Sequence, residues 1–530
     1  MMTPRWWQTA AIYQIYPRSF ADSNGDGVGD LQGIIGHVPY LKSLGVAAVW
    51  ISPFYPSPMR DFGYDITDYC GVDPLFGAMA DFDALLAALH DAGLKLILDF
   101  VPNHTSDQHP WFVESRASRT SDKRDWYIWR DGRNGGPPNN WLSEFGGSAW
   151  QYDEASGQYY HHAFLGCQPD LNWRNPKVRA AMHEAMRFWL RKGVDGFRVD
   201  VMWHLMKDAA FRDNPPNPDF EASRPPHEAL LAVHSADVAE VHEVVAGLRA
   251  VTDEFDDRLL IGEIYLPLER LVAYYGESGD GAHLPFNFSL LATPWRAAAL
   301  ADLITRYEAL LPRGAWPNWV LGNHDRPRLS HRIGAAQTGV ATMLLLTLRG
   351  TPTLYYGDEL GLPQVEIPPA RVQDPWEKNL PGRGLGRDGA RTPMPWKAEA
   401  FAGFSTVEPW LPLNVDFVTR NVETESRDGA SLLTLTKRLL ALRSATPALN
   451  RGAISHVEAR GDVLSYRRSH DDEVILVALN LGAAAATLDT APAGTVLLST
   501  HVSTDGDRTG ERVSGPLALA GNEGVVVRAG

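Results

Sequence analysis

The sequence has little cysteine and an excess of acidic over basic residues. Its only cysteines are Cys70 and Cys167 in a chain of 530 residues. Two thiols cannot build a disulfide framework, so a reducing compartment is favoured, although a single bridge stays open. The chain carries 49 Lys and Arg against 64 Asp and Glu, a net charge of −15. This balance disfavours nucleic acid or an anionic membrane as a partner.

The sequence also shows no segment that would direct the protein to a membrane or to a secretion pathway. The apolar stretch "GVATMLLLTL" stops at Arg349 and is too short to span a bilayer. The first twenty residues, "MMTPRWWQTAAIYQIYPRSF", lack the basic start and sustained apolar core of a secretion signal. We therefore expect a soluble, cytoplasmic protein, with its oligomeric state left open.

The front half of the chain alternates apolar, β-rich runs with amphipathic helical patterns. "VAAVWISP" and "LKLILDFVPNH" are typical of buried strands, and "DFDALLAALHDAG" between them has helical spacing. Such alternation predicts parallel strands covered by helices. The rhythm resumes after residue 173 with strands such as "VDGFRVDV", "RLLIGEIY" and "WPNWVLGNHD".

Two regions depart from this alternation and predict separate units. Residues 105–172 are rich in Trp, Gly, Asn and Pro, which indicates a small irregular subdomain rather than a structureless loop. From residue 452 onward, short strands with turn residues between them predict an all-β domain. The expected organisation is a catalytic domain over 1–104 and 173–451, an insertion over 105–172, and a C-terminal β domain over 452–530.

Polar residues terminate several predicted strands. "DFVPNH" ends at His104, "GFRVD" at Asp200, "GEIY" carries Glu263, and "NHD" ends at Asp325. In a parallel β/α barrel the loops after the strands share one face, where active sites lie. One such carboxylate is more often a cap or a loop contact. Three together are costly to bury without a function.

These motifs resemble the α-amylase superfamily, a large family of α-retaining glycoside hydrolases. "DFVPNH", "QPDLNW", "GFRVD", "GEIY" and "NHD" occur in its order, and "QPDLNW" with "GRDGARTPMPW" is similar to its α-glucosidase and oligo-1,6-glucosidase subgroup. The resemblance covers nearly the whole chain. It implies an α/β fold: a (β/α)8 TIM barrel, an irregular subdomain inserted after the third strand, and a C-terminal β sandwich.

The resemblance also assigns catalytic roles. Asp200 matches the nucleophile, Glu263 the general acid/base and Asp325 the carboxylate that stabilises the transition state. Retaining hydrolysis uses two carboxyl groups about 5–5.5 Å apart, one attacking and one protonating the leaving oxygen. Glu263 must start protonated, whereas Asp200 must be ionised, a form that neighbouring Arg198 favours.

Substrate contacts are implied by the same comparison. His104 and His324 match histidines that hydrogen-bond the glucose; zinc ligation is the alternative, but no HExxH motif or cysteine cluster supports it. In "RDFGYD", Tyr64 matches a ring that stacks on glucose. Asp61 matches a carboxylate that grips the glucose 4-hydroxyl together with an arginine, for which we take Arg391 first and Arg387 second.

Aromatic residues of the insertion have two open interpretations. Trp150, Phe145 and Phe164 either line the side that receives the leaving group or pack in the core of the insertion. The sequence favours neither role.

The segment "DSNGDGVGD" at residues 22–30 resembles half of a calcium-binding EF-hand. An EF-hand needs a bidentate Glu at its twelfth position, where this chain has Gly33, so a calcium sensor is excluded. The resembling subgroup carries a similar loop that binds structural Ca²⁺, or Mg²⁺ in some members. By that resemblance Asp22, Asn24, Asp26 and Asp30 would ligate through side chains and Val28 through its carbonyl. A metal-free acidic turn is the alternative.

The resemblance implies a retaining, exo-acting α-glucosidase that removes the terminal non-reducing glucose of short oligosaccharides. Its covalent intermediate can pass to a sugar instead of water. The first alternative is therefore a glucosyl-transferring or isomerising enzyme, of the trehalose or sucrose type, and the second is a non-catalytic sugar-binding relative. Val201, which follows the nucleophile, is the residue type linked to α-1,6 cleavage, but Trp203 departs from the oligo-1,6-glucosidase pattern. Linkage preference therefore stays open.

Overall fold

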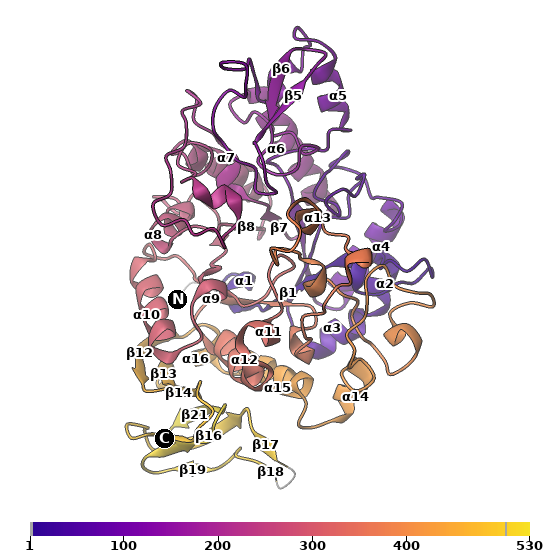
Figure 1. The fold of residues 1–530 in the computed structure, drawn as a ribbon. Helices are drawn as coiled ribbons and strands as arrows, with labels where there is room; N and C mark the ends of the chain where they lie inside the picture. Colours follow the sequence, from indigo (N-terminus) through magenta and orange to yellow (C-terminus); the bar gives the residue numbers. More distant parts are fainter. Residues whose placement is uncertain (1–3, 504–505) are drawn as a thin grey trace.

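The computed structural model describes residues 4–503 and 506–530. The first three residues of the expected catalytic domain and residues 504 and 505 of the expected C-terminal domain lie outside the described residues. A helix-covered barrel forms the body of the molecule. The inserted strands β5 and β6 lie at one end, and the C-terminal strands lie at the other (Figure 1).

Eight parallel strands form the barrel sheet, in the spatial order β10-β11-β1-β2-β3-β7-β8-β9. The strands are β1 (Ile12–Ile15), β2 (Ala48–Ile51), β3 (Lys95–Phe100), β7 (Gly196–Val199), β8 (Leu259–Gly262), β9 (Leu284–Pro285), β10 (Asn318–Val320) and β11 (Thr351–Tyr355). Each neighbouring pair in that order is hydrogen-bonded in parallel register. The predicted α/β barrel is thus confirmed.

The two ends of the sheet, β9 and β10, meet through a side chain rather than through a strand ladder. The Asn318 side-chain amide donates to the Pro285 carbonyl, and its oxygen accepts the Asn287 N–H at 2.8 Å. Asn318 is fully buried. This seam between β9 and β10 closes the barrel.

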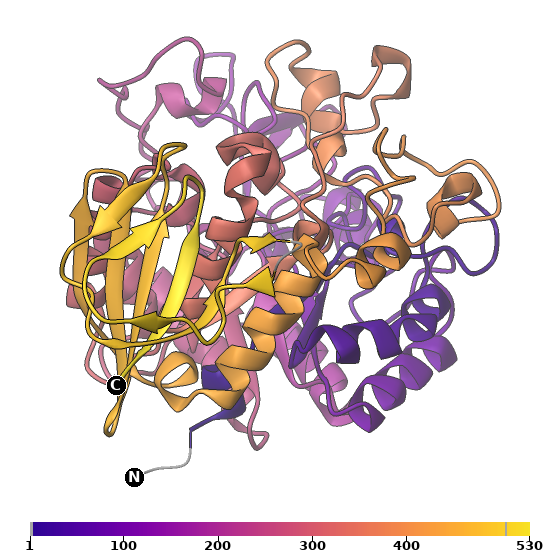
Figure 2. The same cartoon turned by 90° about the horizontal axis from the view of Figure 1, so that it is seen from below.

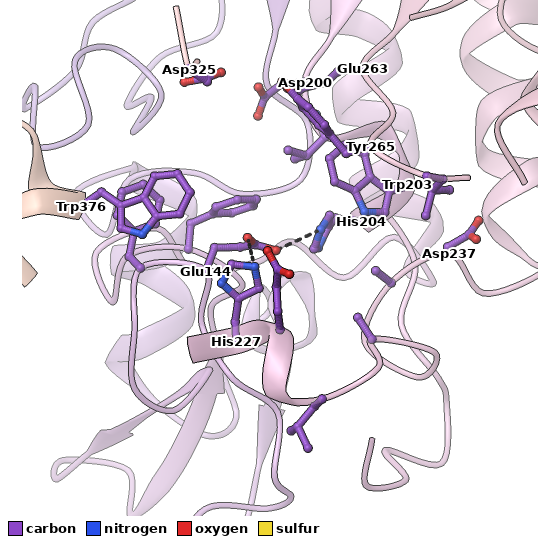
Figure 3. A pocket seen from close by; sticks show the side chains of 18 of the residues that line it. Glu144, Asp200, Trp203, His204, His227, Asp237, Glu263, Tyr265, Asp325 and Trp376 are labelled. Atoms are coloured by element: carbon purple, nitrogen blue, oxygen red, sulfur yellow. Dashed lines mark hydrogen bonds and ion pairs between the residues drawn. The ribbon is translucent and has the colours of Figure 1, made fainter. Parts of the chain in front are cut away.

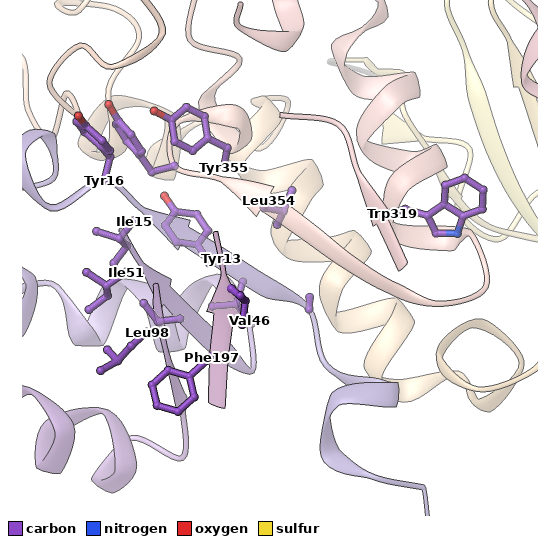
Figure 4. Close-up of a cluster of buried hydrophobic side chains, with 14 of the residues drawn as sticks. Tyr13, Ile15, Tyr16, Val46, Ile51, Leu98, Phe197, Trp319, Leu354 and Tyr355 are labelled. Carbon is purple, nitrogen blue, oxygen red and sulfur yellow. The ribbon is translucent and has the colours of Figure 1, made fainter. Parts of the chain in front are cut away.

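Alternating side chains divide the strands into an inner and an outer face. Ile12 and Trp50 belong to the cluster inside the barrel. Their chain neighbours Tyr13 and Ile51 pack outward among the helices, as Figure 4 shows together with Leu98 and other residues. Successive strand residues point to opposite faces, so this pattern fixes the register. Near the carboxyl ends of the strands the inner face becomes polar, because Gln14, Asp99 and Arg198 stand there, all buried.

Helices between the strands cover the outer face. The main ones are α2 (Leu31–Gly36), α3 (Val38–Leu44), α4 (Met79–Asp91), α6 (Pro176–Lys192), α7 (Val241–Asp253), α10 (Ala297–Leu310), α12 (Thr338–Thr347) and α15 (Leu432–Ala445). Shorter helices lie in the connections: α1 (Trp6–Thr9), α5 (Pro110–Ala117), α8 (Leu268–Leu271), α9 (Ser289–Ala292), α11 (Leu329–Ile333), α13 (Pro375–Asn379), α14 (Val422–Arg427) and α16 (Pro447–Asn450).

Helix α6 illustrates how local sequence sets the bounds of an element. The Asn175 side chain accepts the Lys177 N–H at the start, and Pro176 occupies the first helical position, where its missing N–H costs nothing. Gly193 ends the helix at φ 106°, a conformation that glycine adopts without strain.

The apolar run near Arg349 is explained by helix α12. All of its residues from Val340 to Thr347 are buried, because α12 packs against both α15 and strands of the C-terminal sheet. Within residues 4–503 and 506–530 no helix is long and apolar enough to span a bilayer.

The insertion contains a small antiparallel sheet with the order β4-β6-β5. Its strands are β4 (Trp129–Arg130), β5 (Trp150–Asp153) and β6 (Gln158–His161). An isolated bridge between His104 and Asp170 and the bond from the Thr105 N–H to the Pro169 carbonyl tie it to the end of β3. The insertion is therefore anchored beside the carboxyl ends of the barrel strands.

The C-terminal domain has a six-stranded sheet in the order β12-β13-β14-β21-β16-β19, which Figure 2 shows from below. Its strands are β12 (Ala453–Arg460), β13 (Val463–His470), β14 (Glu473–Asn480), β16 (Gly494–Ser499), β19 (Arg512–Val513) and β21 (Gly524–Ala529). Two-stranded sheets add β15 (Ala486–Leu488) with β20 (Leu517–Leu519), and β17 (Val502–Ser503) with β18 (Gly506–Asp507).

Alternation in β14 shows how this domain is held. Ile475 and Val477 join the core shared with the barrel, whereas Leu476 and Ala478 join the core that includes residues of β15 and β20. The six-stranded sheet is therefore covered on both faces.

Candidate active site

A cavity of about 680 Å³ opens at the carboxyl ends of the barrel strands. Seven of the nine residues expected to act in catalysis or sugar binding line it: Asp61, Tyr64, His104, Asp200, Glu263, His324 and Asp325. Figure 3 shows Asp200, Glu263 and Asp325 near one another at one side of the cavity. Arg198 and Arg391, both fully buried, are not part of its lining.

Arg198 holds two of the three carboxylates. One guanidinium nitrogen, Nη1, lies 2.7 Å from Asp200 Oδ1 and 2.8 Å from Asp99 Oδ1, while Nη2 lies 2.9 Å from Glu263 Oε2. The Val201 N–H also donates to Glu263 Oε2 at 2.8 Å. One guanidinium therefore holds Asp200 and Glu263 on its two neighbouring nitrogens.

Burial dominates the titration of this pair. It raises the pKa of Asp200 well above the ordinary value, and the charge of Glu263 adds to the shift. Burial also raises the pKa of Glu263. We expected Arg198 to favour ionised Asp200; it does act in that direction, but burial outweighs it. The protons of such a pair leave in two steps that belong to both groups.

For the pKa of Asp325, the neighbouring charges outweigh burial. Burial alone would raise its pKa, but His324, Arg387 and Arg391 together hold it below the ordinary value. Arg391 Nη2 lies 2.9 Å and Arg387 Nη1 lies 3.3 Å from Asp325 Oδ1. Asp325 is therefore the acid of the three that stays ionised most readily.

Arg387, not Arg391, is the partner of Asp61, which corrects our first choice. Arg387 Nη2 lies 2.8 Å from Asp61 Oδ1, whereas Arg391 bonds Asp325 and the His324 carbonyl. Helix α13 explains the difference. Asp374, which caps it, accepts the Arg387 N–H and lies 2.7 Å from Nη2, so the Arg387 side chain is fixed at both ends.

The histidines are buried and neutral. Burial lowers the pKa of both His104 and His324. The Gln14 amide donates to His324 Nδ1 at 2.7 Å, which leaves the proton on Nε2, 2.8 Å from the Tyr64 hydroxyl. Tyr64 in turn stacks on the His324 ring, with centroids 5.4 Å apart and planes at 8°. This network fixes both rings at the wall of the cavity.

Two residues behind the lining, which the sequence analysis did not single out, complete this network. Asp99 bonds Arg198, and its Oδ2 accepts the Tyr64 hydroxyl at 3.0 Å. The Gln168 amide nitrogen lies 3.1 Å from Asp61 Oδ2 and 3.3 Å from His104 Nε2. Asp99 does stand at the end of a predicted strand, which was an available signal. Gln168 lies inside the quoted motif "QPDLNW", but its role needs the fold.

The opposite side of the cavity joins the insertion to the connection after β7. Glu144 Oε2 lies 2.9 Å from His227 Nε2, and its Oε1 lies 3.8 Å from His204 Nε2 (Figure 3). These charges lower the pKa of Glu144 to about 2 although burial opposes the shift. Phe145 and Phe164 line the cavity, whereas Trp150 packs inside the insertion with Trp141. Phe145 and Phe164 therefore agree with the first interpretation, lining of the cavity, and Trp150 agrees with the second, packing in the core of the insertion.

The acidic loop at residues 22–30 is closed by its own backbone. Asp22 accepts the N–H groups of Gly25 and Gly27, Asn24 accepts that of Asp26, and Asp26 accepts that of Val28. Asp30 bonds Ser23 and caps helix α2. Over the described part of the chain, no group of three or more His, Cys, Asp or Glu is placed to hold a metal ion. The side-chain donors are all oxygens, the type that Ca²⁺ prefers.

Paired buried carboxyls on a shared arginine, beside a third ionised acid in a cavity of a β/α barrel, are the groups that glycoside hydrolysis uses. The α-amylase catalytic domain model matches residues 14–452, and a domain of unknown function, DUF3459, matches residues 452–526. The chain belongs to the α-amylase family.

Three proteins that are similar to this chain are the following. A probable α-glucosidase of Rhizobium meliloti (strain 1021) is 44% identical, covering 91% of this chain and 90% of the relative. An oligo-1,6-glucosidase of Parageobacillus thermoglucosidasius is 39% identical, covering 90% of each chain. The crystal structure of an α-glucosyl transfer enzyme, XgtA, is 42% identical with a TM-score of 0.94 and covers 100% of both chains.

Replacement of Arg387 tests the role of the Asp61 pair. Arg387→Ala leaves Asp61 and Asp374 buried without their cation, so kcat/KM on maltose should fall about 30- to 1,000-fold, equivalent to about 2–4 kcal/mol. Arg387→Lys should recover little, because lysine lacks the planar fork. Arg383→Ala, an exposed arginine of the same connection, is the matched control. Equal activity of the Arg387→Ala and Arg383→Ala enzymes would contradict the role.

Proposed function

We propose that this protein is an exo-acting, retaining α-glucosidase of short oligosaccharides. The observation that carries the proposal is the Asp61–Arg387 ion pair, which is 2.8 Å long and buried and lines the same cavity as the Asp200–Glu263 pair. A rigid charged pair at that position blocks a chain that continues past the 4-hydroxyl of the bound glucose. Only the last sugar of a chain can then reach the carboxylates.

The first half of the reaction forms a covalent intermediate. Ionised Asp200 attacks the anomeric carbon while protonated Glu263 gives its proton to the departing oxygen. Arg198 steadies both groups before and after this transfer. Asp325, held ionised by two arginines, strengthens its bonds to sugar hydroxyls as positive charge develops on the ring.

In the second half, Glu263 takes a proton from the acceptor as the acceptor displaces Asp200. Water gives hydrolysis, whereas an alcohol or sugar gives glucosyl transfer. Glucosyl transfer is the second candidate activity, and the similarity to an α-glucosyl transfer enzyme supports it.

A single set of assays tests the function. Maltose, isomaltose, trehalose, sucrose and soluble starch should separate linkage preferences, and proton NMR at early times should detect α-glucose as the first product. Amylose digests should release only glucose at first. Rapid formation of mid-length maltodextrins would mean an open cleft, and initial β-glucose would exclude Asp200 as the nucleophile.

We also propose that the protein works in the cytoplasm as a carbohydrate-metabolising enzyme. Both Cys70 and Cys167 are free thiols, which suits a reducing compartment. Fractionation of the native host, with a cytoplasmic and an exported marker enzyme, tests this location.

We further propose a structural Ca²⁺ in the loop at residues 22–30, held by the Asp22, Asn24, Asp26 and Asp30 side chains and the Val28 carbonyl. The donor chemistry supports this, and the bound ion would stiffen the connection between β1 and α2. Chelation should then lower the melting temperature, because an ion that binds only the folded state stabilises it by mass action.

The metal test has its own control. Asp26→Ala should remove most of the effect of the chelator on the melting temperature, whereas Asp68→Ala, an exposed acid outside the loop, should leave it intact. An unchanged melting curve after measured removal of all divalent metal would reject the site.

A further inference from the structure

A second cavity, of about 190 Å³, shares no lining residue with the active-site cavity. Residues of three stretches enclose it: 128–130 of the insertion, 172–174 before helix α6, and 205–211 in the connection after β7. Segments that are distant in the sequence therefore meet around one small space, which the proposed sugar chemistry does not use.

The charge that lines this second cavity is opposite in sign to that of the protein. Of the described residues in its lining, Arg130, Arg174 and Lys207 are basic and none is acidic. The chain as a whole has a net charge of −15, and seven acids and four arginines line the active-site cavity. A cleft lined by one sign of charge concentrates ions of the other sign, so the second cavity favours anions.

Arg130 has no carboxylate partner to balance its charge. Its Nη1 donates to the Trp129 carbonyl at 2.8 Å, whereas Nε and Nη2 have no hydrogen-bond partner among the residues that the structure describes. Burial lowers the pKa of this guanidinium, and no neighbouring charge opposes the shift. Two adjacent open N–H groups on one guanidinium form the planar fork that binds an oxyanion through two hydrogen bonds.

Phe211 holds the Arg130 guanidinium at the second cavity. The guanidinium carbon of Arg130 lies 3.9 Å from the centroid of the Phe211 ring. Phe211 has φ 52°, an unfavourable conformation for a bulky residue that persists only where its surroundings enforce it. Here the Asn139 amide donates to the Phe211 carbonyl at 3.1 Å, and the Phe211 N–H donates to the Asp208 carbonyl at 3.1 Å. The ring that supports Arg130 is therefore fixed by both backbone groups of its own residue.

The other two cations of the second cavity are each paired with one acid. Arg174 Nη2 donates to the Lys207 carbonyl at 2.7 Å and lies 3.1 Å from Glu240 Oε1. Lys207 Nζ lies 2.5 Å from Asp170 Oδ2 and 2.7 Å from Asn103 Oδ1. These contacts fix both groups at the cavity and offset their charges. The charge that stays uncompensated is that of Arg130.

We propose that the second cavity binds a phosphate group, as inorganic phosphate or as the phosphate of a small ester. A phosphate group carries about −1.5 to −2 charges at pH 7 and several strong acceptor oxygens. Its oxygens accept the Nε and Nη2 hydrogens of Arg130, and Arg174 and Lys207 add attraction from the other two segments. The bound group ties the insertion to the barrel. This site is independent of the proposed sugar chemistry, so its test needs no substrate.

Titration calorimetry with inorganic phosphate tests the site in the whole protein. In a HEPES buffer whose ionic strength is held constant with potassium chloride, one phosphate should bind per chain. The melting temperature should rise with phosphate concentration, because a ligand that binds only the folded state stabilises it by mass action. A second titration with methyl phosphate distinguishes the two forms of the ligand. Tighter binding of methyl phosphate indicates an ester, and weaker binding indicates free phosphate.

Arg130→Gln keeps the length of the side chain while removing its charge. The variant should bind phosphate about 10- to 100-fold more weakly, because charge-assisted hydrogen bonds are lost. Arg133→Gln, which changes an exposed arginine of the same insertion outside the lining, is the matched control and should bind phosphate as the unaltered protein does. Arg326→Gln removes an exposed arginine that lines the active-site cavity and should also leave the affinity unchanged. Melting curves without phosphate show whether each variant is folded.

Three results would overturn the phosphate site. The first is the absence of saturable phosphate binding to the unaltered protein. The second is an affinity that falls in Arg326→Gln but not in Arg130→Gln, because the anion would then occupy the active-site cavity. The third is an equal loss in Arg130→Gln and Arg133→Gln, which would reflect the general surface charge of the insertion. Hydrolysis of maltose tests only the proposed α-glucosidase function, so the two proposals can fail separately.

Discussion

Replacement of Asp200 by Asn is expected to abolish turnover of every α-glucoside. An amide cannot form the glucosyl ester, so kcat should fall on the order of 10⁴-fold or more. Arg198 keeps Asp99 and Glu263 as partners in this variant, and the fold should survive. Kinetics on maltose and on an activated aryl α-glucoside, together with a melting curve, measure both effects.

A small anion identifies the missing group in a truncated variant. In Asp200→Ala, azide can enter the space that the carboxylate leaves and attack the same face of the sugar. Activity on an activated aryl α-glucoside should partly return and the product should be the β-glucosyl azide. Asp99→Ala, which removes the neighbouring carboxylate that does not line the cavity, should not yield that product. Formation of the α-glucosyl azide from Asp200→Ala would contradict the assignment.

Replacement of Glu263 by Gln should discriminate between leaving groups. The variant cannot protonate the departing oxygen, and general acid catalysis contributes about 10²- to 10⁴-fold. The loss should therefore be near the upper end for maltose, whose leaving group needs the proton. The first step should be nearly unaffected for 2,4-dinitrophenyl α-glucoside, whose leaving group departs without one. Burst kinetics would then detect the accumulated glucosyl enzyme.

Glu144→Gln is the matched control, because it changes another carboxyl of the same cavity on the side away from Asp200. It should lower activity without any dependence on the leaving group. If Glu263→Gln affects maltose and the dinitrophenyl substrate equally, Glu263 is not the acid.

The barrel could be predicted largely because its strands are apolar and its helices are periodic. Seven of the eight strands are buried runs in the sequence: the five quoted above, together with "AAIYQIY" for β1 and "TPTLYYGDE" for β11. The exception is β9, which consists only of Leu284 and Pro285. Two residues give no periodicity, and a proline weakens any strand assignment. Only the barrel as a whole reveals that this short segment pairs with β8.

The site residues likewise include some that the sequence predicts and some that only the fold reveals. Asp200, Glu263 and Asp325 follow predicted strands, so topology alone brings them together. Arg387 and Arg391 stand four residues apart in an irregular connection, and no pattern tells which guanidinium reaches Asp61. The capping of α13 by Asp374 decides it.

Because β9 and β10 share no strand ladder, the ring of barrel strands is interrupted at one boundary. Asp200 and Glu263 lie on one side of the seam, after β7 and β8, and Asp325 lies on the other side, after β10. Every other strand boundary resists sliding through its backbone ladder, whereas this one is held by the Asn318 side chain. Relative movement of β9 and β10 would disturb the two Asn318 side-chain bonds but no strand ladder. We therefore expect the barrel to be most compliant at this boundary, which separates Asp325 from the other two acids.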